Sequence, residues 1–241
     1  MQGRKRNIVF CSLVFALALG LSACRKNNND TKAPAATSYV SVLHLAPTAP
    51  SLEVFFDNTQ VSINPFTPGS VSGAYNPVDR GSFSIVFKKD GSDSIVASVP
   101  SVMYDSLRYY TIFVYNLQVN GPAQAFRIED DFNNITLVKS FYRFIHASPN
   151  TGAVDLYIGT AKHQTGRLLA DNTGNISFNS FLETTPGYHN LQVKLAGTDS
   201  TIASQSNVEL LAGAAYTIYL KGLTNGSGSR QLSVNVLRAT N

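Results

Sequence analysis

The sequence contains no tryptophan, only two cysteines and only four histidines in 241 residues, and charged residues make up 14% of it. Two cysteines, Cys11 and Cys24, are too few for the disulfide framework that stabilises many small secreted domains. The histidines form no His-x-His or His-x-x-x-His pair, so a zinc site is not expected. We therefore expect a fold that depends on its hydrophobic core and needs no cofactor or metal.

A hydrophobic run near the N-terminus is too short to be a transmembrane helix. Basic residues occupy positions 4–6, and residues 8–23 contain no charge. A membrane-spanning helix needs about 20 apolar residues, whereas a basic segment followed by a shorter apolar run and small residues is typical of a signal peptide. The run ends in Leu21-Ser22-Ala23-Cys24, which resembles the lipobox of bacterial lipoproteins. The resemblance implies that residues 1–23 are removed and that Cys24 carries a lipid anchor in the membrane. The alternative is an ordinary secretory signal with an incidental cysteine.

Removal of residues 1–23 changes the charge balance. The mature chain keeps 16 of the 19 Lys and Arg residues against all 15 Asp and Glu residues, so its net charge is +1. We expect no nucleic-acid partner for such a chain. Residues 24–37 are polar or small and contain no aromatic residue, which predicts a flexible tether. Arg25 stands where many inner-membrane lipoproteins have Asp, and this favours the outer membrane without deciding between its periplasmic and cell-surface faces.

The remainder of the chain contains one pattern twice. Val42-Leu43-His44-Leu45-Ala46-Pro47 returns 102 residues later as Phe144-Ile145-His146-Ala147-Ser148-Pro149. Further on, residues 91–98 return as residues 197–204, at an offset of 106. The second copy therefore holds four extra residues in its middle. A repeat of this kind marks domain boundaries, and we predict domains at 38–133 and 134–241.

Both copies have the apolar pattern of strands. Apolar residues alternate with polar ones in residues 83–88 and 191–195, and turn residues recur every 8 to 12 positions. This pattern predicts an all-β protein of two tandem immunoglobulin-like β-sandwich domains, an analogy of architecture alone because the Cys and Trp hallmarks are absent. Five pairs of equivalent apolar positions predict the cores: Val54 and Leu156, Phe56 and Ile158, Ile85 and Leu191, Phe87 and Val193, Ile112 and Ile218.

The opening of each copy resembles a known bacterial envelope family. His146-Ala147-Ser148-Pro149 followed by Val154-Asp155-Leu156-Tyr157 is similar to the His-Ala-Ser-Pro and Val-Asp-Val-Tyr motifs of the family called domain of unknown function 4397. The first copy departs from these motifs, with His44-Leu45-Ala46-Pro47 and Leu52-Glu53-Val54-Phe55. The resemblance implies a β-sandwich module of secreted or lipid-anchored proteins. The family has no established activity, so it implies no catalytic residues.

One histidine ends the first predicted strand of each copy. His44 and His146 could bind a ligand or metal, or they could donate to a carbonyl of the turns at Pro47 and Pro149 and hold the strand end in place. We favour structural turn anchors, because a role repeated at equivalent positions is what a requirement of the fold would produce.

Other polar segments show no catalytic arrangement. Residues 69–73 lack the central serine of a nucleophile elbow. Residues 129–134, between the copies, could offer oxygens to calcium but are interpreted as a solvated linker. Residues 171–175 lack the spacing of a calcium loop and are interpreted as a turn. No pattern brings an acid and a base together, so we do not expect an enzyme.

Three Asp-Ser-x sequences are candidate O-glycosylation sites, at Ser94, Ser106 and Ser200. They resemble the sequon that Bacteroidetes use in the periplasm, and Ser94 and Ser200 occupy the same predicted hairpin tip in the two copies. The alternative is that Gly, Ser and Asp are simply the residues that hairpin turns need.

These observations favour a non-catalytic outer-membrane lipoprotein that serves as a binding, adhesion or structural module of the cell envelope. Its ligand could be a glycan or a protein. A glycan would need exposed aromatic residues, for which four tyrosines predicted in or beside loops are candidates: Tyr75, Tyr104, Tyr109 and Tyr188. One alternative is a fimbria-like structural subunit, cut by a protease after Arg80 or Arg108. A hydrolase is the third hypothesis.

Overall fold

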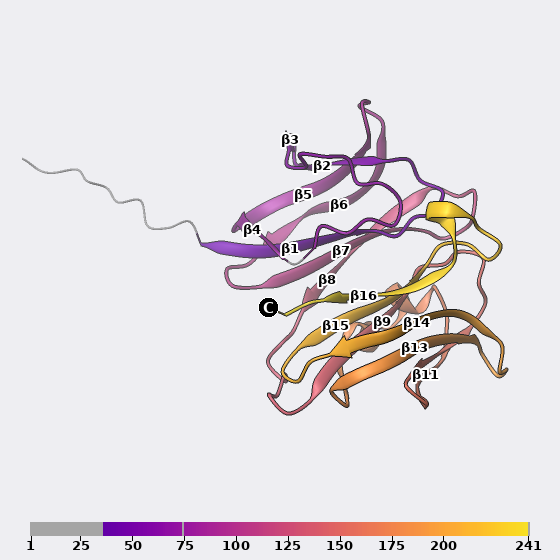
Figure 1. The fold of residues 1–241 in the computed structure, drawn as a ribbon. Helices are drawn as coiled ribbons and strands as arrows, with labels where there is room; N and C mark the ends of the chain where they lie inside the picture. Colours follow the sequence, from indigo (N-terminus) through magenta and orange to yellow (C-terminus); the bar gives the residue numbers. More distant parts are fainter. Residues whose placement is uncertain (1–35, 74, 241) are drawn as a thin grey trace, which may run out of the picture. The chain divides into compact units, whose positions relative to one another are not determined.

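The computed structural model describes residues 36–73 and 75–240, which are almost entirely β-structure (Figure 1). Within these residues four sheets of four strands form two β domains. No helix in the described ranges is long and apolar enough to cross a membrane. Cys24 and the predicted signal peptide lie outside the described residues, and the last predicted tether residue, Thr37, is already the first residue of a strand.

The first domain contains eight strands in two sheets. Their order is β4-β1-β7-β8 in one sheet and β3-β2-β5-β6 in the other. The bounds are β1 (Thr37–His44), β2 (Leu52–Phe56), β3 (Thr59–Gln60), β4 (Asn76–Asp79), β5 (Gly81–Lys89), β6 (Ile95–Tyr104), β7 (Tyr109–Asn116) and β8 (Ala123–Asp130). Strands β1 and β7 are parallel neighbours, and the other pairs are antiparallel.

The second domain repeats this topology. Its sheets have the orders β12-β9-β15-β16 and β11-β10-β13-β14. The bounds are β9 (Ser140–His146), β10 (Val154–Ile158), β11 (Ala161–Arg167), β12 (Leu182–Thr184), β13 (Gly187–Leu195), β14 (Thr201–Leu210), β15 (Ala215–Lys221) and β16 (Ser233–Arg238), with the short helices α1 (Asp171–Gly174), η1 (Ile176–Asn179) and η2 (Gly228–Arg230). The four extra residues fall between β10 and β13, where α1 and η1 lie, because the sequence offset rises from 102 to 106 across that segment.

The strand order differs from that of an immunoglobulin constant domain. There the first two strands belong to one sheet, whereas β1 and β2 lie in different sheets. Each domain also has eight strands, whereas an immunoglobulin constant domain has seven.

The predicted core positions lie between the two sheets of each domain. Nine of the ten are buried, at 3% exposure or less, and Phe56 packs half-buried against the same core. The expected alternation holds in β5 and β13, where only every second central residue is buried. These strands line one core and show their other face to solvent.

Three strands do not alternate as the sequence analysis expects. All residues of β9 are buried, and almost all of β7 and β15 are. The reason is a third apolar cluster, in which Leu43, Phe113 and Ile128 of the first domain pack with Ile145 and Tyr219 of the second. The sheets that contain β1 and β9 therefore have one face on their own core and the other on the neighbouring domain, and a strand buried on both faces reads as continuously apolar.

Candidate functional site

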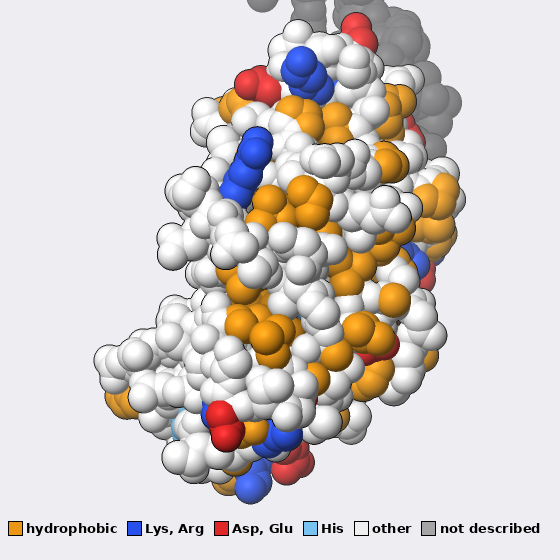
Figure 2. Space-filling view, turned by 90° about the vertical axis from the view of Figure 1, so that its right-hand side faces the viewer, with side chains coloured by type: hydrophobic (Ala, Val, Ile, Leu, Met, Phe, Trp, Pro, Cys, Tyr) orange, Lys and Arg blue, Asp and Glu red, His pale blue; other side chains and the backbone are white. Residues whose placement is uncertain are grey.

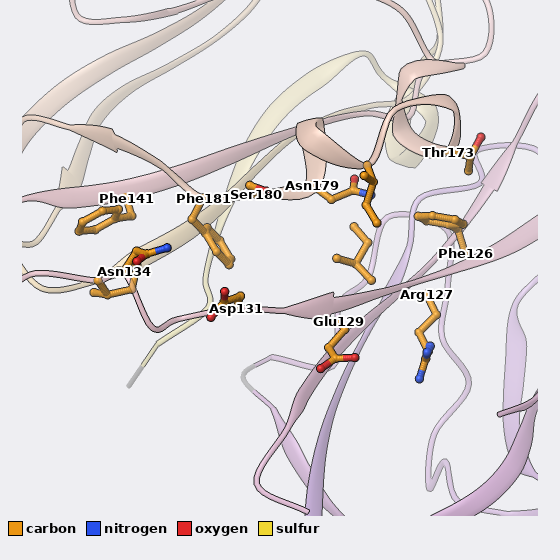
Figure 3. Close-up of a pocket in the computed structure, with 13 residues that line it drawn as sticks. Phe126, Arg127, Glu129, Asp131, Asn134, Phe141, Thr173, Asn179, Ser180 and Phe181 are labelled. Atoms are coloured by element: carbon orange, nitrogen blue, oxygen red, sulfur yellow. The ribbon is translucent and has the colours of Figure 1, made fainter. Parts of the chain in front are cut away.

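A cleft of about 390 Å³ lies where the two domains meet (Figure 3). We call it the interdomain cleft. Six apolar side chains line it: Phe126 and Ile128 of β8, Ile135 of the linker, Phe141 of β9, Ile176 of η1, and Phe181. Polar lining residues include Asp131, Asn134, Asn179 and Ser180. Ligand sites favour such places, between domains and with an apolar wall and a few polar groups.

Among the residues that line the cleft, Asn179 is the one with a buried side-chain atom that has no hydrogen-bond partner in the described part of the chain. Its side chain lines the cleft from the end of η1 and is 8% exposed, and its Oδ1 has no hydrogen-bond partner among the described residues. A buried acceptor without a donor costs about 1–3 kcal/mol of stability. Such a cost is understandable where a ligand supplies the missing donor.

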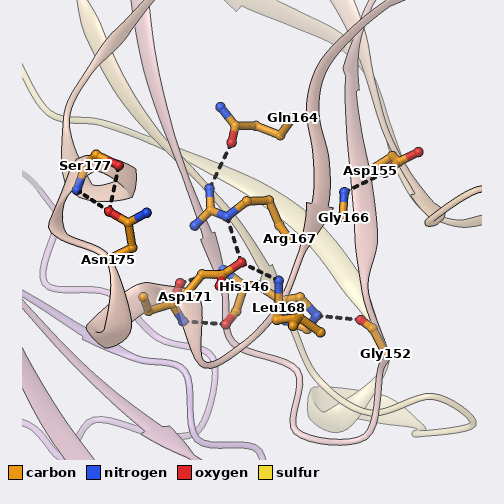
Figure 4. Close-up of polar contacts among 11 residues, drawn as sticks. His146, Gly152, Asp155, Gln164, Gly166, Arg167, Leu168, Asp171, Asn175 and Ser177 are labelled. Atoms are coloured by element: carbon orange, nitrogen blue, oxygen red, sulfur yellow. Dashed lines mark hydrogen bonds and ion pairs between the residues drawn. The ribbon is translucent and has the colours of Figure 1, made fainter.

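Hydrogen bonds to β9 hold α1, which leads into η1 and Asn179; Figure 4 shows the polar contacts around His146 and Asp171. The fully buried side chain of Asn172 donates from Nδ2 to the His146 carbonyl over 2.6 Å, and the His146 N–H donates to Asn172 Oδ1 over 3.2 Å. Asp171 accepts from the Leu168 N–H over 2.8 Å. The two bonds of Asn172 tie α1 to the end of β9, and the bond of Asp171 ties α1 to the segment before it; together they hold the chain that leads into η1.

A buried arginine supports the other side of this wall. Arg167 is 1% exposed, and its guanidinium carbon lies 3.9 Å from the centre of the Phe178 ring in η1. It donates from Nη1 to Gln164, and its Nε lies 3.5 Å from Asp171 Oδ2. Burial lowers the pKa of Arg167, although its ordinary value is high enough to keep the charge. The short helix η1 therefore packs between a fixed cation and the cleft.

An ion pair between the two domains lies beside Phe181, one of the residues that line the cleft. Arg143 of β9 donates from Nη1 to Asp130 of β8, and both side chains are 0% exposed. Arg143 also donates to Thr111 over 2.7 Å and to Thr217 over 2.9 Å. Its guanidinium carbon lies 4.8 Å from the centre of the Phe181 ring. The ion pair therefore fixes both the domain junction and one aromatic wall of the cleft.

This pair corrects the interpretation of residues 129–134 as a solvated linker at Asp130, which is buried, whereas Glu129, Asp131, Asn133 and Asn134 are exposed as that interpretation expects. Asp130 is the last residue of β8 and accepts from the hydroxyls of Thr111 and Tyr75. Burial, and then the charge of Asp130, raise the pKa of Tyr75 above its ordinary value. In the described residues no group of three His, Cys, Asp or Glu side chains is placed to hold a metal ion.

His44 and His146 are buried and lie against the turns that follow their strands. His44 Nε2 donates to the Pro50 carbonyl over 2.9 Å, and His146 Nε2 donates to the Gly152 carbonyl over 3.1 Å. Pro47 and Pro149 lie in these turns. Burial lowers the pKa of His44 to about 4 and also lowers that of His146. Neither imidazole faces the cleft.

The candidate glycosylation sites differ in accessibility. Ser94 and Ser200 are exposed at the tips between β5 and β6 and between β13 and β14, whereas Ser106 is half-buried in the turn before β7. Of the tyrosines considered as platforms, Tyr104 is completely buried and Tyr188 is 64% exposed. No tyrosine lines the interdomain cleft.

A second hollow, of about 840 Å³, lies along the edges of the first domain's sheets. Core residues such as Val40, Val42 and Val54 reach it because the covering strands are short, β3 with two residues and β4 with four. The equivalent strand β11 of the second domain has seven residues. This hollow contains no buried polar side chain without a partner.

Sequence reasoning missed Asn179, Arg143 and Asp130. The only signal in the sequence was a difference between the two copies at the position of Arg143. In the first copy Ser41 pairs with Thr111, and at the equivalent position of the second copy Arg143 pairs with Thr217, so an arginine replaces a serine.

Comparison with known proteins agrees with the repeat. The model of the family described as domain of unknown function (DUF4397) matches residues 38–157 and, a second time, residues 140–239. The search of curated proteins found no match. Because the two matches together span most of the chain, the protein belongs to the DUF4397 family and contains its domain twice.

Proposed function

We propose that this protein is a non-catalytic envelope module, anchored to the outer membrane through a lipid on Cys24, and that it binds a ligand in the interdomain cleft. The observation that carries the proposal is the unpartnered Oδ1 of Asn179, which is buried in the wall of an otherwise mostly apolar cleft.

The shared core between the domains supports a binding role. Ile128 belongs both to that core and to the cleft lining, so the cleft walls cannot separate without exposing buried apolar surface. A cleft held in one shape loses little conformational freedom when a ligand binds, and this favours affinity. In this proposal each domain is an immunoglobulin-like module in the architectural sense of two packed sheets.

The outer surface offers further contact area. Figure 2 shows hydrophobic side chains gathered over the middle of one face, with charged side chains mainly towards its ends. Exposed apolar areas of this kind are frequent at interaction sites. An adhesion role would use such a face together with the cleft.

The fimbria-like alternative receives less support. Arg80 lies between β4 and β5, so cleavage there would separate β1 to β4 from the rest of the chain. Strand β1 is not an edge strand, because it pairs with β4 on one side and β7 on the other. Strand exchange at this position would have to rebuild the middle of a sheet.

The test is a screen of immobilised glycans and proteins with the mature chain, repeated with Ser180→Trp, which places an indole in the cleft. The matched control is Ser206→Trp, at an exposed serine of β14 outside the cleft. We expect ligands whose binding Ser180→Trp abolishes and Ser206→Trp leaves unchanged. Binding that neither variant alters, or steady release of product from an assayed glycan or peptide, would overturn the proposal.

The face of the membrane is tested separately by protease shaving of intact and lysed cells, followed by immunoblotting. Digestion of intact cells would place both domains outside and favour adhesion or nutrient capture. Digestion only after lysis would favour a role inside the envelope.

A further inference from the structure

The aromatic residues of the interdomain cleft are either buried or already in contact with other side chains of the protein. Phe181 has the Arg143 guanidinium 4.8 Å from its ring centre and the Phe132 ring stacked at 5.3 Å. Phe141 is 2% exposed, and Phe126 packs against Phe113 at 5.5 Å. A sugar ring binds well to an open aromatic face, so this lining fits an aliphatic or aromatic side chain better than a saccharide.

Large exposed apolar residues also occur in η1 and in the linker before β9. Ile176 lines the cleft and is 84% exposed. Leu137 and Val138, which follow the lining residue Ile135 in the linker, are 85% and 75% exposed. Large apolar side chains are seldom left so exposed in a group, and the usual reason is an interaction with another protein.

The rim supplies one carboxylate for a basic partner group. Asp131 lines the cleft and forms no ion pair among the described residues, although its Oδ1 accepts from the Asn133 N–H. Its neighbour Glu129 has Arg108 at 3.8 Å. The side chain of Arg127 points away from the cleft (Figure 3), and its guanidinium carbon lies 4.8 Å from the centre of the Tyr110 ring. Asp131 is therefore a negatively charged side chain at the rim that no described residue neutralises by an ion pair.

We propose that the interdomain cleft binds a segment of a partner polypeptide in which an apolar residue stands next to a basic one. The apolar side chain enters between Phe126 and Phe181, a peptide N–H donates to Oδ1 of Asn179, and the basic side chain pairs with Asp131. This inference rests on the proposed function and names its ligand class.

The experiment uses a random-peptide display library, selected on the mature chain and counter-selected on Ser180→Trp. We expect enrichment of peptides with an apolar residue beside Lys or Arg. A synthetic peptide from the selection is then titrated by calorimetry against the mature chain and three variants. Asn179→Leu should weaken binding about tenfold or more, because the buried donor of the peptide loses its acceptor. Asp131→Asn should weaken binding less and remove most of its salt dependence. The control, Asn58→Leu in the exposed turn after β2, should leave binding unchanged.

A glycan array probed with these four proteins and with Ser180→Trp separates the two proposals. Glycan binding that Ser180→Trp abolishes, without any enriched peptide, would overturn the peptide inference and leave the cleft as the binding site. Peptides that bind Asn179→Leu and Asp131→Asn as tightly as the mature chain would also overturn it. Failure of both probes to bind in a cleft-dependent way would overturn the proposed function as well. Unfolding midpoints of all variants show whether a loss of binding reflects a loss of fold.

Discussion

Removing one partner of the ion pair between the domains should destabilise the protein far more than removing both. Arg143→Met leaves the Asp130 carboxylate buried at 0% side-chain exposure, with only the hydroxyls of Thr111 and Tyr75 as donors. Breaking a buried pair from one side costs about 3–5 kcal/mol, because a charge remains without compensation. We expect Arg143→Met to lose a free energy of unfolding in that range.

The double variant Arg143→Met with Asp130→Leu should recover at least about 2 kcal/mol of that loss. Replacement of a whole buried ion pair by apolar residues of similar volume is often neutral or stabilising. The hydroxyls left behind can pair with each other, since Tyr75 Oη and Thr111 Oγ1 are 3.2 Å apart. The remaining cost should be that of lost hydrogen bonds from Arg143 to the threonines, not that of a buried charge.

Urea unfolding followed by circular dichroism measures both effects. With a slope of about 2–3 kcal/mol per M, the single substitution should lower the midpoint by about 1–2 M. The two domains share the apolar cluster around Phe113 and Ile145, so the wild-type protein should unfold in one transition. The reasoning is refuted if Arg143→Met changes the free energy of unfolding by less than about 1 kcal/mol, or if the double variant loses the sum of the two single losses.

Four further outcomes are expected. Burial lowers the pKa of His44 to about 4 in the folded state from an ordinary 6.5, so the unfolded chain takes up the proton first as the pH falls. The contribution of the neutral imidazole to the free energy of unfolding is therefore complete above pH 6.5 and falls by about 1.4 kcal/mol per pH unit as the pH drops towards 4. Urea titrations at several pH values should show a smaller fall for His44→Gln. Asn179→Leu should raise the unfolding midpoint, because it removes an unpartnered buried acceptor, while it weakens ligand binding about tenfold or more; a lowered midpoint would contradict this account. Asn172→Ala should cost about 1–3 kcal/mol and weaken ligand binding, because two bonds to β9 are lost; unchanged binding would mean that α1 does not position the cleft wall. If the hairpin tips are glycosylated, the exposed Ser94 and Ser200 should carry the glycan, and the intact mass should fall in the double alanine variant; a mass equal to that of the lipidated polypeptide would rule this out.

Local and repeated features of the sequence were sufficient to predict the β class, the two-fold repeat and the cores. Equivalent positions such as Ile85 and Leu191 keep an apolar residue in both copies, and both are completely buried. The location of the four extra residues was also correct, since they fall between β10 and β13. The strand order was not predictable in this way, because β1 and β7 are neighbours in the sheet but lie about 70 residues apart in the chain, and periodicity describes only each strand by itself.

What the sequence by itself determined is therefore the repeated domain and the faces that its strands bury inside it, because both follow from patterns that lie within one strand or recur at a fixed offset. Only the tertiary structure decided that β7, β9 and β15 are buried on both faces, that Asp130 meets Arg143, and that Asn179 borders a cleft. The physical reason is that these features come from the packing of one domain against the other. The free energy of that packing depends on which side chains meet across the junction. The periodicity of apolar residues within a strand does not indicate those contacts.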